Sequence, residues 1–294
     1  MRFAFVIATL DRPRDLQECI VSIEKAYDFK INTEIEILIV SQDRQKTRPI
    51  EVKYPEFTKF YHIDKIGLAA ARNFAIKQSN ADYFVFLDDD AEIKVDFLYV
   101  LAEIVDLTGA EALCGRILDL NSTEYFSKCF EYDRIKYLKR TDFRCFMGSS
   151  HIFKKSIFKK IGFYDERFGA GAKYAGAEES DMFFRIKLQN RQVIYVPKLI
   201  FYHPISFQVP ASKVFDYSFA VGAMFMKQML SDSKHFLTYS FIIGEVIIKS
   251  FLRALQAGFF KKKFELKDSR FHYKAVLMGT LKGLHNYIKN EDRD

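Results

Sequence analysis

Three consecutive carboxylates, Asp88, Asp89 and Asp90, directly follow an apolar segment, Tyr83 to Leu87. Three negative charges at the end of one strand repel one another unless a cation neutralises them. Carboxylate oxygens suit Mn²⁺ or Mg²⁺, which proteins often share with the phosphate groups of a substrate. A solvated turn leading into a helix near Asp96 would explain the same residues. The strand-like segment in front of them favours the metal site.

A second group of acids, Glu178, Glu179 and Asp181, lies at the start of a predicted helix that ends near Gln189. Acidic side chains at a helix N-terminus are stabilised by the helix dipole, so these residues could simply cap the helix. One of them could instead act as a general base that takes a proton from an attacking hydroxyl group. The glycines upstream, from Gly169 to Gly176, would allow that loop to close over a ligand. The residues alone leave both interpretations open.

His203 is a candidate ligand that stands by itself in the sequence, just beyond a predicted strand. A lone histidine is more often packed or at the surface than bound to a metal. The other histidines form neither an HExxH zinc motif nor a nucleophile–base pattern. The segment Gly169 to Lys173 lacks the spacing of a phosphate-binding P-loop. The sequence therefore predicts no zinc site, no serine-type triad and no P-loop.

These side chains need a scaffold of alternating strands and helices, which the hydrophobic pattern supplies. The predicted strands are Phe3–Ala8, Ile35–Val40, Lys59–Ile63, Tyr83–Leu87 and Val193–Val196. Pro197 is expected to close the last of them. The alternation indicates an α/β fold with a mostly parallel, Rossmann-like sheet and flanking helices. Ligands bind beyond the carboxyl ends of such strands, where polar clusters follow three of these segments.

Composition restricts the class of protein further. The 294 residues include 45 Lys and Arg and 38 Asp and Glu, but thirteen of the basic and seven of the acidic residues lie in residues 227–294. The rest of the chain is nearly neutral and offers no basic groove, so nucleic acid is not an expected partner. Four cysteines without metal-binding spacing indicate reduced thiols in a cytoplasmic protein.

Membrane insertion is not expected from the sequence. The first apolar run, Phe3 to Leu10, is too short for a signal peptide or a membrane span, and no later stretch reaches eighteen uncharged apolar residues. The chain is expected to divide into a domain of residues 1–210 and a helical C-terminal region of residues 211–294. In that region Phe236 to Phe260 is apolar apart from one stripe, and Lys261–Lys263 follow. This pattern suits either an anionic membrane surface or a helix packed on the main domain.

Taken in order, several segments resemble motifs of one enzyme family. They are the opening Phe5-Val6-Ile7-Ala8-Thr9-Leu10-Asp11-Arg12-Pro13, Gly67-Leu68-Ala69-Ala70-Ala71-Arg72-Asn73, Phe86-Leu87-Asp88-Asp89-Asp90, Ile161 to Phe168 with Gly176 to Asp181, and Tyr202-His203-Pro204. The chain is similar over residues 2–210 to bacterial family 2 glycosyltransferases of the GT-A fold. The resemblance implies a metal-dependent, inverting glycosyltransferase of the hexosyltransferase class that acts in surface polysaccharide synthesis.

The resemblance also implies a role for each matching residue. The expected metal ligands, for Mn²⁺ or Mg²⁺, are Asp88, Asp90 and His203. The expected donor-binding residues are Thr9, Asp11, Arg12, Gln42, Asp43, Arg72, Asp88, Asp89, Gly148 and Ser149. Glu179 matches the catalytic base, and Asp181 or Glu178 would orient the acceptor.

The same resemblance implies the partners: a nucleotide-sugar donor, with a UDP-sugar favoured, and a glycan or lipid-linked acceptor. The enzyme would be cytoplasmic and could attach to the inner face of the plasma membrane through its C-terminal region. Two alternatives are a nucleotidyltransferase of similar fold and a non-catalytic, basic nucleic-acid-binding protein. The turn from Thr9 to Pro13 is too short and too acidic for the triphosphate loop that a nucleotidyltransferase needs.

Overall fold

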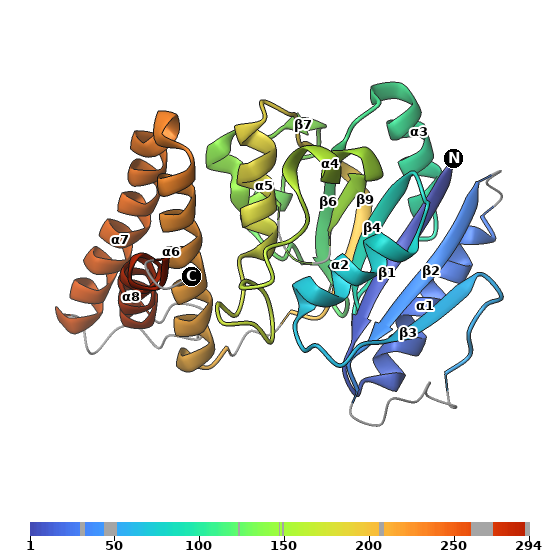
Figure 1. Cartoon of the computed structure of the whole chain (residues 1–294), viewed down its shortest axis with the longest axis horizontal. Coiled ribbons are helices and arrows are strands. Elements are labelled where there is room, and N and C mark those ends of the chain that lie inside the picture. Colours follow the sequence, from blue (N-terminus) through green and yellow to red (C-terminus); the bar gives the residue numbers. More distant parts are fainter. Residues whose placement is uncertain are drawn as a thin grey trace. The chain divides into compact units, whose positions relative to one another are not determined.

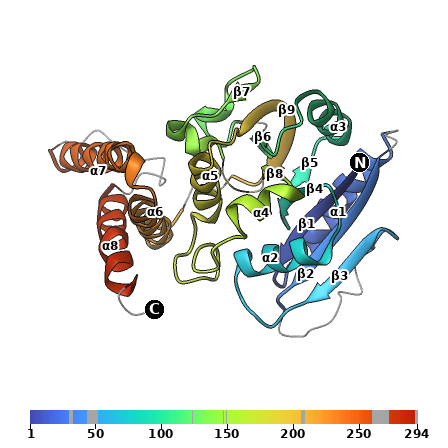
Figure 2. The same ribbon diagram turned by 45° about the horizontal axis from the view of Figure 1, so that its top comes forward.

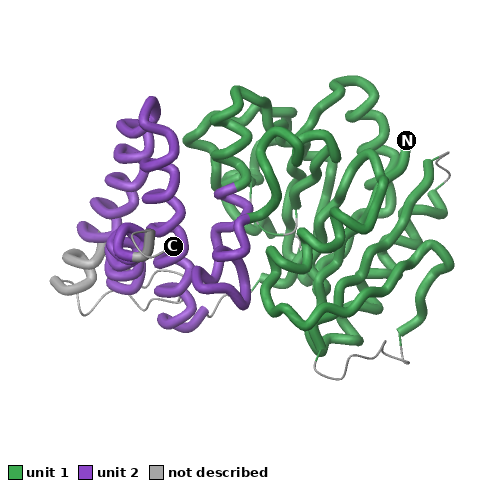
Figure 3. The backbone as a smooth tube through the Cα atoms, in the orientation of Figure 1, with its two compact units in different colours: residues 1–164, 182–205 green, residues 165–181, 206–294 purple. Residues whose placement is uncertain are grey.

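The structure, a computed structural model, divides the chain into two compact units. It describes residues 1–29, 33–43, 52–122, 124–146, 148, 150–205, 209–259 and 273–291. Unit 1 comprises Met1–Tyr164 and Met182–Ile205, and unit 2 comprises Asp165–Asp181 and Ser206–Asp294 (Figure 3).

Unit 1 is built on a nine-stranded sheet, which confirms the expected α/β class. Its strands are β1 (Arg2–Thr9), β2 (Glu34–Ser41), β3 (Thr58–His62), β4 (Tyr83–Asp88), β5 (Glu92–Ile93), β6 (Ala112–Asp119), β7 (Lys136–Tyr137), β8 (His151–Lys154) and β9 (Ile194–His203). The order is β3-β2-β1-β4-β8-β6-β9-β5, and β7 pairs with β9. Strands β3, β2, β1 and β4 are parallel, as expected, whereas β8 is antiparallel to both of its neighbours. The sheet is therefore parallel in its N-terminal half and mixed beyond β4.

Helices cover both faces of this sheet, as Figures 1 and 2 show. They are α1 (Pro13–Tyr27), α2 (Leu68–Gln78), α3 (Phe97–Thr108), α4 (Phe158–Ile161) and α5 (Glu178–Leu188). Phe5 on β1 contacts Phe97 of α3, whereas Phe84 on β4 contacts Phe158 of α4. Phe84 lies opposite Ala4 in the ladder, so it projects from the other face of the sheet than Phe5. Burial on both faces explains the unbroken apolar runs of these strands.

The strand expected to end at Pro197 instead continues to His203, so that expectation was wrong. The register of β6 against β9 shifts between Gly115 and Arg116, so that Val196 pairs with Gly115 and Ile200 with Arg116. Pro197 thus lies in a bulge, where its missing N–H breaks no ladder hydrogen bond. A Cβ at Gly115 would come within 2.2 Å of the Leu199 carbonyl oxygen, so glycine is required at this crossing. The bulge carries the chain on to His203.

Unit 2 consists mainly of three helices, α6 (Ala211–Ser231), α7 (Phe236–Phe259) and α8 (Tyr273–Glu291). Helices α6 and α8 approach closely because glycines line their contact. A Cβ at Gly222 would lie 2.2 Å from the Thr280 carbonyl oxygen, and one at Gly283 would lie 2.0 Å from the Phe219 carbonyl oxygen. Larger residues there would force the helices apart.

The segment Asp165–Asp181 belongs to this helical unit, although the sequence pattern places the boundary near residue 210. Lys227 of α6 explains the association, because its Nζ lies 2.8 Å from Asp165 Oδ2 and 2.7 Å from Asp181 Oδ1. Arg167 donates a hydrogen bond to the Tyr287 hydroxyl of α8 at 3.0 Å. Ion pairing between distant segments cannot be seen in a hydrophobic pattern. The expected domains of residues 1–210 and 211–294 stay a prediction.

Within the described part of the chain, Ser233–Leu252 is long and apolar enough to cross a membrane by length and composition, with a mean hydropathy of 1.3. Two of its charged residues, Glu245 and Lys249, form an ion pair one helical turn apart. A core helix of a soluble protein passes the same test. The expectation that the chain does not cross a membrane therefore stays a prediction.

Candidate active site

Three residues expected to hold a metal ion lie together at the carboxyl edge of the sheet. Asp88 ends β4, Asp90 follows in the next turn, and His203 ends β9. The His203 Nε2 atom lies 3.3 Å from Asp90 Oδ1 and 3.7 Å from Asp88 Oδ2. One ligand atom from each residue falls within 4.8 Å of the others. All three side chains are about one-quarter exposed, so a ligand can reach them.

The orientation of His203 suits a metal ligand. Its Nδ1 atom lies 2.9 Å from the Pro204 carbonyl oxygen, to which an Nδ1–H group donates. The Nε2 atom therefore faces the two carboxylates, either protonated or with its lone pair available to a cation. Burial lowers the pKa of His203, but its hydrogen bond to Asp90 and the charges of both aspartates outweigh burial and raise it. Two carboxylates and one imidazole fit Mn²⁺ or Mg²⁺.

Asp89 differs from its two neighbours because it is buried beneath this site. Its Oδ2 atom accepts a hydrogen bond from the Thr9 hydroxyl at 2.8 Å, and its Oδ1 atom lies 3.2 Å from Arg12 Nη1. Burial raises the pKa of Asp89 to about 6, although Thr9 and Arg12 oppose the shift. Thr9 and Asp89 are both expected to bind the sugar donor. Their hydrogen bond to each other fixes the end of β1 to the turn after β4.

Two arginines supply much of the positive charge near Asp88, Asp89 and Asp90 that was expected to come from a metal ion. Arg12 lies between Asp89 and Asp90, with its Nη1 atom 3.1 Å from Asp90 Oδ2, and its side chain is 52% exposed. Arg72 lies 3.3 Å from Asp88 Oδ1 and is only 1% exposed. The hydrogen bond to His203 and the charge of Arg12 help to lower the pKa of Asp90. Repulsion among the three acids is therefore partly relieved by the chain itself.

The residues after β2 are tied to neighbouring loops. Gln42 donates from Nε2 to the carbonyl oxygens of Lys65, at 2.5 Å, and Gly67, at 3.1 Å. The Asp11 N–H group donates to Asp43 Oδ1 at 2.6 Å, and Asp11 has a φ of 53°, uncommon for a residue other than glycine. Gln42 and Asp43 thus hold the loops that border the carboxyl edge of β1 and β2.

Sequence reasoning missed a buried network beside the cluster of Asp88, Asp90 and His203, because His151 looked like an ordinary lone histidine. His151 is fully buried, its Nδ1 atom lies 2.9 Å from the Gly148 carbonyl oxygen, and its Nε2 atom lies 2.6 Å from the Tyr164 hydroxyl. Burial, reinforced by the charge of Arg72, lowers the pKa of His151 well below its usual value. The neutral ring therefore donates to Gly148 and accepts from Tyr164.

The same network reaches Asp88 through Arg72. The Arg72 guanidinium lies 5.8 Å from the centre of the Phe86 ring and 5.7 Å from that of Tyr164. Asn73 and Tyr164 exchange two hydrogen bonds of 2.9 Å through the Asn73 amide and the Tyr164 backbone. The Arg72-Asn73 pair and Tyr164 belong to two segments quoted for the resemblance, and that was the available signal. Gly148, with a φ of 61°, is tied to this network, whereas Ser149 lies outside the described residues.

The three acids at the start of α5 differ in exposure. Asp181 is fully buried, and its Oδ1 atom accepts a hydrogen bond from Gln228 at 2.8 Å in addition to the Lys227 ion pair. Glu178 is 4% exposed and lies against Gly169. Glu179 is partly exposed. Among the three, Glu179 is the most accessible to a substrate, and Asp181 is engaged in holding α6.

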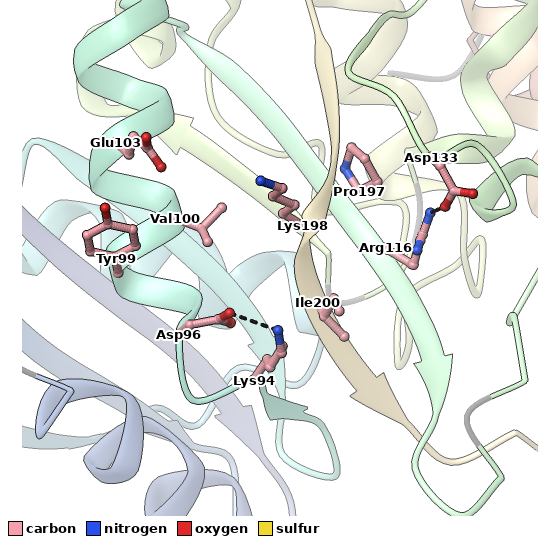
Figure 4. A pocket seen from close by; sticks show the side chains of 10 residues that line it. All are labelled: Lys94, Asp96, Tyr99, Val100, Glu103, Arg116, Asp133, Pro197, Lys198 and Ile200. Carbon is pink, nitrogen blue, oxygen red and sulfur yellow. Dashed lines mark hydrogen bonds and ion pairs between the residues drawn. The ribbon is translucent and has the colours of Figure 1, made fainter.

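A groove elsewhere on unit 1 contains none of the expected site residues. It has a volume of about 420 Å³ and lies between α3 and the bulged part of β9 (Figure 4). Lys94 pairs with Asp96 at 2.8 Å, and Arg116 pairs with Asp133 at 2.5 Å. Charges on its walls are thus largely satisfied by one another.

Solved structures with a similar fold include two of S. aureus TarS. The crystal structure of TarS 1–349 matches with a TM-score of 0.63 and 17% identity, covering 99% of this chain and 90% of that one. The crystal structure of TarS matches with a TM-score of 0.62 and 17% identity, covering 99% of this chain and 55% of that one. These likenesses confirm the expected GT-A fold.

Two relatives are similar to part of the chain in sequence. An uncharacterized protein of Haemophilus influenzae is 28% identical over 113 residues, which are 36% of this chain and 60% of that protein. The uncharacterized glycosyltransferase YwdF of Bacillus subtilis is 26% identical over 172 residues, which are 56% of this chain and 62% of that protein. The chain thus spans about three fifths of the length of each relative.

The family comparison covers just over half of the chain. The model of glycosyl transferase family 2 matches residues 4–162, which include most of β1, all of β2 to β8 and the Asp88–Asp90 turn. This match supports the expected family over the nucleotidyltransferase and nucleic-acid-binding alternatives. The chain therefore belongs to glycosyl transferase family 2.

Proposed function

We propose that the chain is a metal-dependent, inverting glycosyltransferase that moves a sugar from a nucleotide-diphosphate donor to a hydroxyl group of its acceptor. The observation that carries this proposal is the cluster of Asp88, Asp90 and His203 at the carboxyl edge of the sheet. Crystal structures of S. aureus TarS 1–349 in complex with UDP and with UDP-GlcNAc support a UDP-sugar as donor. Transfer of a hexose would place the enzyme among the hexosyltransferases.

The residues divide the chemistry between donor and acceptor. Asp88, Asp90 and His203 would hold Mn²⁺ or Mg²⁺, which when bound stabilises the charge of the departing diphosphate. Arg12, half-exposed beside Asp90, would contact the donor phosphates. Glu179 takes the proton from the acceptor hydroxyl, which attacks the anomeric carbon from the side opposite the leaving group. Asp181 positions the start of α5 through Lys227.

The donor preference is tested with a panel of nucleotide sugars and Mn²⁺. We expect one UDP-sugar to raise the midpoint of thermal unfolding and to be hydrolysed slowly, in both cases only when the metal is present. Chelation with EDTA should abolish both effects, and added Mn²⁺ should restore them. Stabilisation by the same donor in EDTA would contradict metal-dependent donor binding.

His151 is expected to position the donor-binding segment at Gly148. In His151→Asn, the side-chain amide nitrogen takes the place of Nδ1 and still donates to the Gly148 carbonyl. In His151→Gln, the amide lies at the position of Nε2 instead, so the Gly148 carbonyl loses its hydrogen-bond donor. Loss of such a hydrogen bond costs about 1–3 kcal/mol. We therefore expect His151→Gln to raise the donor KM roughly 10-fold above that of His151→Asn, with a similar kcat.

Steady-state kinetics of the two variants, with thermal unfolding as a check on folding, measure this difference. Tyr164→Phe is a matched control, because it removes the other partner of His151 and leaves the bond to Gly148 in place. Equal donor KM values for the Asn and Gln variants would contradict the role of His151.

We further propose that the acceptor is a glycan or lipid-linked sugar of a surface polysaccharide, reached at the cytoplasmic side of an anionic membrane. Helix α7 supports this proposal. Its Leu237, Phe241, Ile248 and Leu252 follow one another at helical spacing and are 81%, 70%, 59% and 52% exposed. The opposite side of α7 is buried in unit 2, so the helix is both packed and apolar on its outer face. Lys261–Lys263, expected to add positive charge, lie outside the described residues.

Charged residues on this face should weaken membrane binding. Leu237→Glu combined with Phe241→Glu is expected to reduce sedimentation with anionic liposomes at least about 10-fold, because two exposed apolar side chains are lost and repulsive charges are introduced. Leu107→Glu is the matched control, since Leu107 is 77% exposed on α3 of unit 1. Equal sedimentation of the double variant and the unmodified chain would show that this face does not bind membranes.

A further inference from the structure

Two cysteines that are sixteen residues apart meet where two short 3₁₀ helices pack together. Cys129 lies in η1 (Lys128–Phe130), and Cys145 ends η2 (Arg140–Cys145). The Cys129 Sγ atom lies 3.3 Å from the Arg144 carbonyl oxygen, and the Cys145 Sγ atom lies 3.7 Å from the Cys129 carbonyl oxygen. Each thiol thus contacts the backbone of the other segment, and both are free thiols here.

The two thiols differ in access to solvent. Cys145 is 3% exposed, whereas Cys129 is half-buried and has the Ser127 hydroxyl 3.5 Å from its sulfur. A hydrogen bond with the Cys145 thiol lowers the pKa of Cys129 to about 7 against the effect of burial, and Ser127 adds to this effect. The same contact, together with burial, raises the pKa of Cys145. A thiol that titrates near neutral pH is the better attacking group in thiol–disulfide exchange.

We propose that Cys129 and Cys145 are a redox-active pair that closes to a disulfide by exchange with a small-molecule disulfide. The Cys129 thiolate attacks one sulfur of oxidised glutathione, the S–S bond of glutathione breaks, and one glutathione thiolate leaves and takes up a proton. Cys145 then loses its proton and attacks the Cys129 sulfur, which releases the second glutathione. The protein loses two electrons and two protons, and oxidised glutathione becomes two molecules of reduced glutathione.

The bond would join two segments that border the active site. Phe126, three residues before Cys129, packs edge-on against His203 at 6.0 Å. Phe146, directly after Cys145, contacts the ring of His151 at 5.5 Å. Because an S–S bond of about 2.05 Å is shorter than any contact between thiols, oxidation draws η1 and η2 together. In a consequence that rests on the proposed function, oxidation should raise the donor KM several-fold.

Peptide mapping tests the pair directly on the full chain. The protein is equilibrated with mixtures of reduced and oxidised glutathione, free thiols are blocked by alkylation, and cross-linked peptides are identified by mass spectrometry. We expect a Cys129–Cys145 disulfide in the unmodified chain and a trapped glutathione on Cys129 in Cys145→Ser. Cys129→Ser should leave Cys145 reduced. Cys19→Ser, which changes a buried thiol of α1, is the matched control and should form the same disulfide.

The outcomes separate the redox pair from the proposed function. Three outcomes would overturn the redox pair. They are stable glutathione on Cys129 beside an alkylated Cys145, a disulfide that involves Cys114, and no reaction of the folded chain. A disulfide that leaves the donor KM unchanged would overturn its link to the active site. Failure of the nucleotide-sugar panel with the fully reduced protein would count against the proposed function and leave the mapping result valid.

Discussion

Glu179→Gln is expected to slow glycosyl transfer by about 10²–10⁴-fold, the usual contribution of a general base. Gln has nearly the same size as Glu but cannot accept the proton of the acceptor hydroxyl. Glu179 is the partly exposed member of its acidic group, so the substitution should leave donor and metal binding near their original values. Single-turnover transfer rates and donor titration, measured on the same preparation, separate the two effects.

The neighbouring acids provide the contrast for this experiment. Asp181→Asn removes the charge that Lys227 pairs with in the interior of unit 2. Breaking an isolated buried ion pair costs about 3–5 kcal/mol. Lys227 keeps its ion pair with Asp165, so we expect a smaller fall in the free energy of unfolding. Glu178→Gln should change transfer much less than Glu179→Gln. A normal rate in Glu179→Gln together with a large loss in Glu178→Gln would move the base to Glu178.

Much of the fold could be predicted from the sequence because buried strands have a strong local pattern. The run Phe3 to Ala8 is apolar at every position, and the structure buries β1 against both neighbouring strands and both helical layers. The structural effect of Pro197 could not be predicted from such a local pattern. Its effect depends on whether its N–H group is needed, and that depends on the register of β9 against β6, which no local pattern contains.

In the candidate site, too, some features could be predicted from the sequence and others could not. Asp88, Asp89 and Asp90 are equivalent as sequence, and only the backbone turn after β4 places Asp89 against Thr9 while Asp90 stays near His203. His151 carried no signal of its own. Gly148 lies only three residues before it, and the loop after α4 brings its other partner, Tyr164, to the ring. Residue types at strand ends were thus predictable. The buried residues that orient them depend on contacts between distant segments.

This difference between adjacent aspartates leads to the second large expected effect. Asp90→Asn should weaken Mn²⁺ binding by more than about 100-fold, because even partners of metal ligands contribute about 10–100-fold to affinity. Transfer at fixed Mn²⁺ should fall at least about 100-fold, since the charge of the leaving diphosphate is less well stabilised. Asp89→Asn, the same chemical change one residue away, should bind Mn²⁺ within a few-fold of the original affinity.

Isothermal titration with Mn²⁺, before and after addition of UDP, compares the two variants. Asp89 is buried against Thr9 and Arg12, and an asparagine there still accepts the Thr9 hydrogen bond, so its variant should remain folded. Arg12 lies beside both aspartates, so loss of its ion pair occurs in both variants and cannot account for a difference between them. Equal weakening of Mn²⁺ binding by the two substitutions would mean that the acids act only through their combined charge. Binding unaffected by Asp90→Asn would remove the metal from the Asp88, Asp90 and His203 cluster, and with it the basis for a metal-dependent transferase.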